Sequence, residues 1–216
     1  MDKGFRALFF LILCLFCIQD FHSQNQKPFS GELTYSIERV DKKDSVKAEM
    51  IIYARDSLIR VVNFNSESGR QELIKHLRFG KSYLLIDTEK QKFAIKTNEH
   101  LQKDSITYTF KKSFSFKKVG GIRARKFKVK QLEIKNEQAF FVHMKISAKY
   151  ANTFTSLPGL PVIYFVPSEN GLYKYTLKSI KYSEPPLQLF TFGKEYKIVT
   201  FEEFSEEFSR LYESGE

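Results

Sequence analysis

The chain has 216 residues, with 35 Lys and Arg against 25 Asp and Glu and a formal net charge of +10. This length fits one domain of ordinary size, without an evident linker. Both cysteines, Cys14 and Cys17, lie near the N-terminus, so the rest of the sequence excludes disulfides, thiolate metal sites and cysteine nucleophiles.

The N-terminus predicts a secretory leader. Lys3 and Arg6 precede an unbroken apolar run at residues 7–18, and polar residues follow, which is the three-part pattern of a signal peptide. The run is shorter than the roughly 20 residues that span a bilayer. We therefore expect residues 1–23 to be removed, leaving no stable membrane span and a single domain at residues 24–216. Lipidation of Cys17 is the alternative, although a large residue precedes this cysteine.

Alternating apolar and polar residues predict β-strands over most of the remaining chain. Leu33, Tyr35 and Ile37 alternate with polar residues, which commits one face of the first strand to a core. Short turns separate the runs that follow, so an antiparallel meander is expected. The further predicted strands are residues 50–53, 58–64, 73–79, 83–86, 92–96, 106–116, 122–134, 139–146, 162–166 and 172–182.

Two glycine-containing turns and one helical turn complete this pattern. Gly120 and Gly121 suit the positive φ angles of a tight hairpin, and Asn170-Gly171 is a second hairpin signal. Residues 148–154 could form one short helical turn or two, before Pro158 and Pro161 interrupt regular structure.

The C-terminus changes to helical periodicity. Thr200 and Glu203 have the spacing of a capping box. An apolar stripe at helical spacing follows, and it predicts an amphipathic helix packed on the sheet, with Phe204 and Phe208 on the concave side. The stripe consists of Phe201, Phe204, Phe208, Leu211 and Tyr212.

No arrangement of residues suggests catalysis or metal binding. His76, His100 and His143 lie in separate segments without metal-ligand spacing. The acidic pairs at residues 202–203 and 206–207 fit the solvated face of the predicted helix. The sequence has no Gly-x-Ser-x-Gly elbow and no Gly-rich phosphate loop. We therefore expect no catalytic residue, no metal site, no cofactor and no enzymatic activity.

The positive charge has two interpretations. Lys126, Lys128 and Lys130 alternate with Phe127 and Val129, as on the solvated face of a half-buried strand. The alternative is attraction to anionic surfaces such as phospholipid head groups or lipopolysaccharide. Predicted export argues against a nucleic-acid partner.

The segment Ser156-Leu157-Pro158-Gly159-Leu160-Pro161 resembles the motif that names the GLPGLI family of exported bacterial envelope proteins, and four of its six positions match. An opening strand at residues 29–35 and a Gly-Gly turn region at residues 120–127 precede it in the family's order. The resemblance implies a mainly β (α+β), LolA-like fold: a strongly curved antiparallel sheet, or half-barrel, wrapped around one or two helices. It also implies a periplasmic or outer-membrane-associated location in a Gram-negative bacterium.

Two functions remain open for such a protein. Phe and Tyr make up 15% of the chain, and aromatic-lined apolar clefts are common ligand sites. The first function is therefore a binding module for a lipid, an acyl chain or another hydrophobic ligand. The second is a non-enzymatic interaction protein that holds an envelope protein by a sheet edge or a basic face.

The ligand-binding prediction places the ligand at the rigid loop of the motif. The alternative is that Leu157 and Leu160 plug the core. The predicted ligand-binding residues are Leu157, Pro158, Gly159, Leu160 and Pro161.

Overall fold

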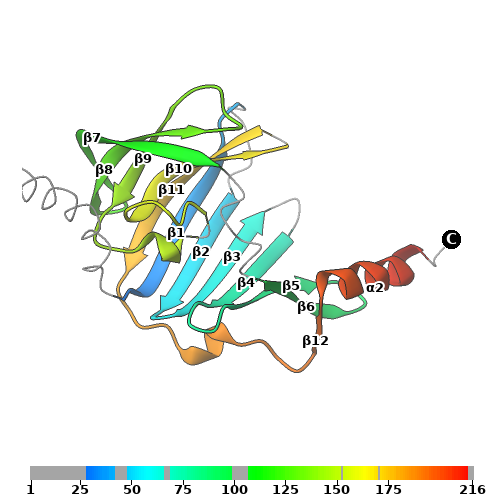
Figure 1. Cartoon of the computed structure of the whole chain (residues 1–216). Coiled ribbons are helices and arrows are strands. Elements are labelled where there is room, and N and C mark those ends of the chain that lie inside the picture. The colour runs from blue at the N-terminus through cyan, green and yellow to red at the C-terminus, as the bar shows by residue number, and fades with distance from the viewer. Residues whose placement is uncertain are drawn as a thin grey trace, which may run out of the picture.

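The computed structural model describes residues 28–41, 48–65, 69–98, 107–151, 153–169 and 171–213, shown in Figure 1. The predicted leader lies outside these residues. The described part of the chain is mainly β, with twelve strands in a single sheet and one α-helix, α2 (Phe201–Glu213).

The strands form two meanders, the first to sixth strands and the seventh to eleventh strands, and the twelfth strand returns to pair with the sixth. Two short 3-10 turns, η2 (Ala148–Tyr150) and η3 (Leu187–Phe190), lie in the connections before β10 and after β11. The strands are β1 (Ser30–Arg39), β2 (Ala48–Arg55), β3 (Leu58–Asn65), β4 (Gly69–His76), β5 (Lys81–Asp87), β6 (Lys92–Asn98), β7 (Tyr108–Val119), β8 (Ile122–Gln131), β9 (Gln138–His143), β10 (Leu160–Ser168), β11 (Gly171–Lys181) and β12 (Tyr196–Val199).

The sheet order is β12-β6-β5-β4-β3-β2-β1-β11-β10-β9-β8-β7. Neighbouring strands are antiparallel except for β12 and β6, which are parallel. The edge strands β12 and β7 do not pair, so the sheet is not closed.

The alternating pattern of β1 is confirmed. Leu33 and Tyr35 are fully buried, whereas Thr34 and Ser36 between them are only partly buried. Because directly opposed residues share a face of a sheet, the partners of Leu33 and Tyr35 extend this core face into β2 and β11.

The predicted turn at Gly120 and Gly121 is also confirmed, with φ angles of 53° and 84°. A Cβ atom on Gly120 would lie 2.9 Å from the Leu177 side chain of β11. The β7–β8 turn therefore contacts a strand that is four positions away in the sheet order. This contact requires the sheet to curl.

The segment between β9 and β10 fills much of the concave side of this curled sheet. Tyr150, Phe154 and Leu157 are 5% exposed or less and pack with side chains of β1, β2, β3, β8 and β10. Phe154 has a φ of 63°, and its ring packs edge to face against Tyr108 and Phe140 with centroids 5.0 and 4.9 Å away. Much of the aromatic content thus serves core packing.

Helix α2 begins as predicted, but it lies near an edge of the sheet. The Thr200 amide donates to Glu203, and the Glu203 amide donates to the Thr200 hydroxyl at 3.2 Å. Phe204 packs on Phe93 of β6 with ring centroids 5.2 Å apart. α2 contacts β6 and β12, far from the centre of the concave side (Figure 1).

The two phenylalanines predicted to be buried together differ in environment. Strand register continues the core face through β4 and β5 to β6, so Phe204 packs on the predicted face. Phe208 is 40% exposed, and the prediction that it packs into the concave side is wrong because α2 covers only the outermost strands. Within the described residues, no helix is long and apolar enough to cross a membrane.

We predict that Phe204→Ala lowers the free energy of unfolding by about 2 kcal/mol, less than the roughly 3 to 5 kcal/mol typical of a fully buried phenylalanine. Phe208→Ala should cost less than about 1 kcal/mol because much of its ring stays in water. Urea titration of both variants measures the difference. Equal losses would contradict the helix position described above.

Candidate functional site

The segment predicted to bind a ligand is part of the core. Leu157 is 5% exposed and Leu160 is fully buried. The Leu160 amide donates to the Ile146 carbonyl at 2.8 Å, and the Pro161 carbonyl accepts a buried hydrogen bond from the Tyr35 hydroxyl at 2.9 Å. These contacts favour the alternative that the leucines plug the core. Direct ligand contact by this loop stays a prediction.

Glycine is required at the centre of the segment. A Cβ atom on Gly159 would lie 2.5 Å from the His143 carbonyl oxygen and 2.9 Å from the Met144 Cα atom. The chain thus passes directly over the end of β9, and this close approach lets Leu157 and Leu160 enter the core from both sides of the glycine.

A cavity lies at the opposite end of β10. It has a volume of about 660 Å³, within the range of roughly 300 to 1,000 Å³ for small-molecule sites. Val166, which lines the cavity, lies six positions after Leu160, so the two regions are about 20 Å apart along the strand. The lining residues are Ile37, Ala48, Asn63, Gln71, Val166, Pro167, Ser168, Glu169, Tyr173 and Tyr175.

Strand register explains how these residues meet. Ile37 of β1 lies opposite Ala48 of β2 and Tyr175 of β11, and Asn63 of β3 lies opposite Gln71 of β4. The cavity thus spans one face of six neighbouring strands, β4-β3-β2-β1-β11-β10. Only a curled sheet brings the outer two of these strands to a common cavity. The site is the part of the concave side that the β9–β10 segment does not fill.

The polar lining is largely neutral. The Asn63 Oδ1 atom is buried and has no hydrogen-bond partner among the described residues. The Tyr175 ring stacks on buried Tyr164, with centroids 4.7 Å apart and planes 11° apart. Burial raises the pKa of the Tyr175 hydroxyl, so this group stays a neutral donor and acceptor near neutral pH. Glu169 is the one charged side chain among the described lining residues.

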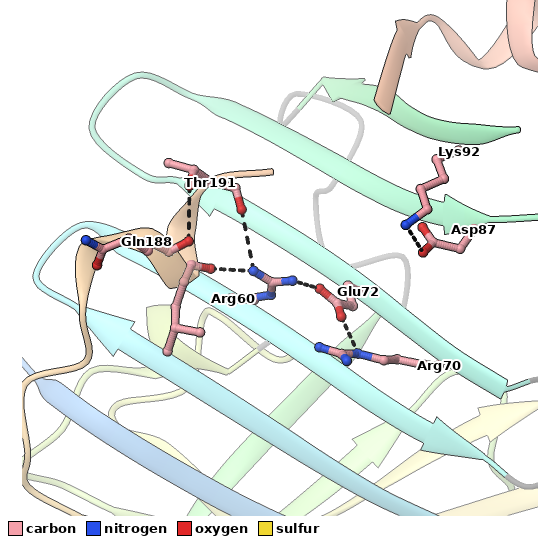
Figure 2. Close-up of polar contacts among 8 residues, drawn as sticks. Arg60, Arg70, Glu72, Asp87, Lys92, Gln188 and Thr191 are labelled. Carbon is pink, nitrogen blue, oxygen red and sulfur yellow. Dashed lines mark hydrogen bonds and ion pairs between the residues drawn. The ribbon is translucent and has the colours of Figure 1, made fainter. Parts of the chain in front are cut away.

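The convex face carries a second polar cluster, shown in Figure 2. Glu72 forms ion pairs with Arg60 and Arg70, and Arg60 also donates to the Leu189 carbonyl at 2.7 Å and the Thr191 carbonyl at 3.5 Å. The Arg60 and Glu72 side chains are only 14% and 10% exposed. The cluster has a structural role: its ion pairs join β3 to β4, and the Arg60 hydrogen bonds hold the η3 connection against β3.

The histidines contribute no comparable site. His143 is 9% exposed, and its Nδ1 atom lies 2.8 Å from the Arg123 carbonyl oxygen. His76 ends β4, and His100 lies outside the described residues. In the part of the chain that the structure covers, no group of three or more His, Cys, Asp and Glu residues could hold a metal ion.

Comparison with known proteins identifies no family. No family model and no curated protein matches the chain. Twenty chains of solved structures are similar to it. One is PNGF-II in a C2 space group, with a TM-score of 0.43 and 14% identity over 82% of this chain and 32% of that one. The chain therefore spans about a third of the length of that protein.

We predict that Leu160→Asp lowers the free energy of unfolding by more than about 4 kcal/mol, because it places an unpaired charge in the core. Leu132→Asp is the matched control, since Leu132 is 79% exposed and its replacement should change little. Thermal melting of both variants measures this. A Leu160→Asp variant that melts like the wild type would place Leu160 on a rim instead.

Proposed function

We propose that this protein is an exported binding module that takes the apolar part of a lipid or another neutral amphipathic ligand into the cavity beneath Tyr173 and Tyr175. The observation that supports it best is the combination of an open cavity of about 660 Å³ with a neutral, partly apolar wall. Ile37, Ala48 and Val166 supply apolar surface, and burial of apolar ligand surface is worth about 25 cal/mol per Å².

Asn63 supplies the second argument. A buried amide oxygen without a hydrogen bond costs about 1 to 3 kcal/mol. The oxygen has almost no accessible surface, so a ligand hydroxyl or amide N–H would reach it only after the Asn63 amide turns toward the cavity. Such a donor would then recover this cost, whereas a pure hydrocarbon would not. The site therefore favours an amphipathic ligand with a hydrogen-bond donor next to its apolar part.

The resemblance to the GLPGLI family supports the same function. In this proposal the chain shares the LolA-like half-barrel, and the β9–β10 segment with η2 occupies the position that a helix takes in that fold. The buried leucines of the motif then hold this segment in place, and the ligand enters at the other end of the concave side.

Uptake of a fluorescent acyl-chain probe tests the proposal. Ala48→Phe introduces a phenyl ring into the cavity and should reduce uptake at least tenfold, because the apolar part of the probe loses its space. Ala139→Phe is the matched control, since Ala139 lies opposite Lys128 on the outer face of β8 and β9. Equal uptake by all three proteins, or none by the wild type, would contradict the proposal.

Asn63→Leu refines this test by separating stability from binding. The free energy of unfolding should stay the same or rise, because leucine has a volume similar to that of asparagine and lacks the unpaired buried oxygen. Affinity for a hydroxyl-bearing acyl probe should fall about fivefold to tenfold, through loss of one hydrogen bond of about 1 to 1.5 kcal/mol. Isothermal titration and melting measure the two effects. A parallel loss of stability and affinity would show that Asn63 acts structurally.

The proposal includes export of the protein to the periplasm. We expect N-terminal sequencing of protein from a periplasmic fraction to begin within a few residues of Gln24, because the apolar run at residues 7–18 is too short to stay as an anchor. Recovery of intact Met1, or of an acylated Cys17 in membranes, would overturn it.

A further inference from the structure

Nearly all of the excess positive charge lies in one hairpin. Residues 108–131, which form β7 and β8, contain nine Lys and Arg and no Asp or Glu. Their formal charge is +9, against +10 for the whole chain. None of the nine forms a salt bridge with a described residue. β7 is also an edge strand of the sheet (Figure 1).

The register of the hairpin places like charges next to one another. Lys111 lies directly opposite Lys128, and Lys118 lies directly opposite Arg123. Such cross-strand pairs destabilise a sheet. The arrangement therefore opposes folding of the hairpin, and an external anionic surface would relieve the repulsion.

Exposed aromatic rings accompany these cations. The register of β7 shifts between Lys112 and Phe116, and an irregularity of this kind re-aims side chains. Phe114 lies at this shift and is 91% exposed, while Phe116 is 45% exposed. Arg123 and Lys128 are five residues apart in a strand whose register on β9 does not shift, so the two like-charged pairs lie on opposite sides of the hairpin. We call Phe114, Phe116 and the cations Lys111, Lys118, Arg123 and Lys128 the basic-aromatic hairpin.

We propose that the basic-aromatic hairpin docks on the anionic head groups of a phospholipid bilayer. Cations near such a surface bind it electrostatically, and phenyl rings among them insert at the boundary between head groups and acyl chains. Docking by this hairpin requires no ligand in the cavity.

The geometry favours a bilayer over a single-stranded nucleic acid. Nucleic-acid platforms need free aromatic faces on which bases stack. The Arg123 guanidinium lies 4.2 Å from the Phe116 ring centroid, and that of Arg125 lies 5.2 Å away. These two arginines thus cover the Phe116 ring on which a base would stack, and Arg123 itself is exposed.

Protection of a sheet edge explains only part of the arrangement. Lysines on an edge strand discourage pairing with other chains, and they would do so without any membrane. That role gives no reason for the exposed Phe114 ring, which adds apolar surface to an edge. Bilayer docking accounts for both the cations and the ring.

Vesicle co-sedimentation tests the proposal with protein recovered from secretory expression, so that all variants share the same N-terminus. Phosphatidylcholine vesicles with and without phosphatidylglycerol are compared at low and high salt. We expect binding only to the anionic vesicles, and we expect high salt to release the protein because exposed charges are screened.

Variants assign the binding to the hairpin. Changing Lys111, Lys118, Arg123 and Lys128 to Gln should weaken partitioning more than a hundredfold, at about fivefold per cation. The matched control changes four exposed lysines outside the hairpin to Gln and lowers the net charge equally. Its positions are Lys81, Lys96, Lys178 and Lys194.

Phe114→Ala should weaken partitioning about fivefold through loss of an inserted ring, without a change in melting temperature. Equal losses in the hairpin and control variants would overturn the proposal, because they would show a general charge effect. So would absence of vesicle binding by the wild type, or tighter hairpin-dependent binding to a fluorescent thymidine oligonucleotide than to anionic vesicles.

Discussion

The rest of the structure depends on how the β9–β10 segment is fixed inside the curled sheet. The Tyr150 hydroxyl accepts a hydrogen bond from the Phe29 amide and donates one to the Asp56 carbonyl, both at 2.9 Å. One buried side chain thus joins the start of β1 to the β2–β3 turn. Loss of such a hydroxyl leaves a buried amide unpaired and costs about 1 to 3 kcal/mol. Because Phe154 and Leu157 follow Tyr150 into the core, the segment fills one end of the concave side and leaves the other end hollow.

This division of the concave side separates stability from binding. The aromatic rings at the filled end contact one another, and the motif leucines are buried in the same core. At the hollow end, the Tyr175 ring both stacks on the buried core and lines the cavity. A ligand bound there would contact a wall that core packing has already fixed, so it would lose little affinity to ordering of the protein. The basic-aromatic hairpin lies on a different strand pair, so variants of the hairpin and of the cavity test the two proposals independently.

The sequence predicts much of the fold because most of its signals are local. Alternation of apolar and polar residues identifies β1. The paired glycines identify the β7–β8 turn because both adopt the positive φ angles that glycine favours. β12 is missed because it has four residues and pairs in parallel with β6, a strand about a hundred positions earlier. The position of α2 is missed for a similar reason, since an apolar stripe shows that a helix packs but not on which strands.

The cavity is harder to predict because its lining comes from six strands. One sequence signal was available: Asn63 continues the inward alternation of Ile59 and Val61, so a polar amide occupies a core position. Arg60 and Glu72 likewise suggest an ion pair only after the β3–β4 register is known, because Glu72 lies two residues from Ile74, the direct partner of Arg60. The residues that meet in the cavity and in the Arg60–Glu72 ion pair are set by the long-range register of the strands, which local sequence patterns do not encode.

Photo-crosslinking tests the central claim, that the ligand enters the hollow end of the concave side. An acyl chain with a terminal diazirine is incubated with the protein and irradiated, and the labelled peptides are identified by mass spectrometry. The structure predicts adducts on residues 166–175 and on the β3–β4 region around Asn63, competed by unlabelled fatty acid. Adducts on residues 157–161 instead, or labelling that excess unlabelled ligand does not reduce, would contradict it.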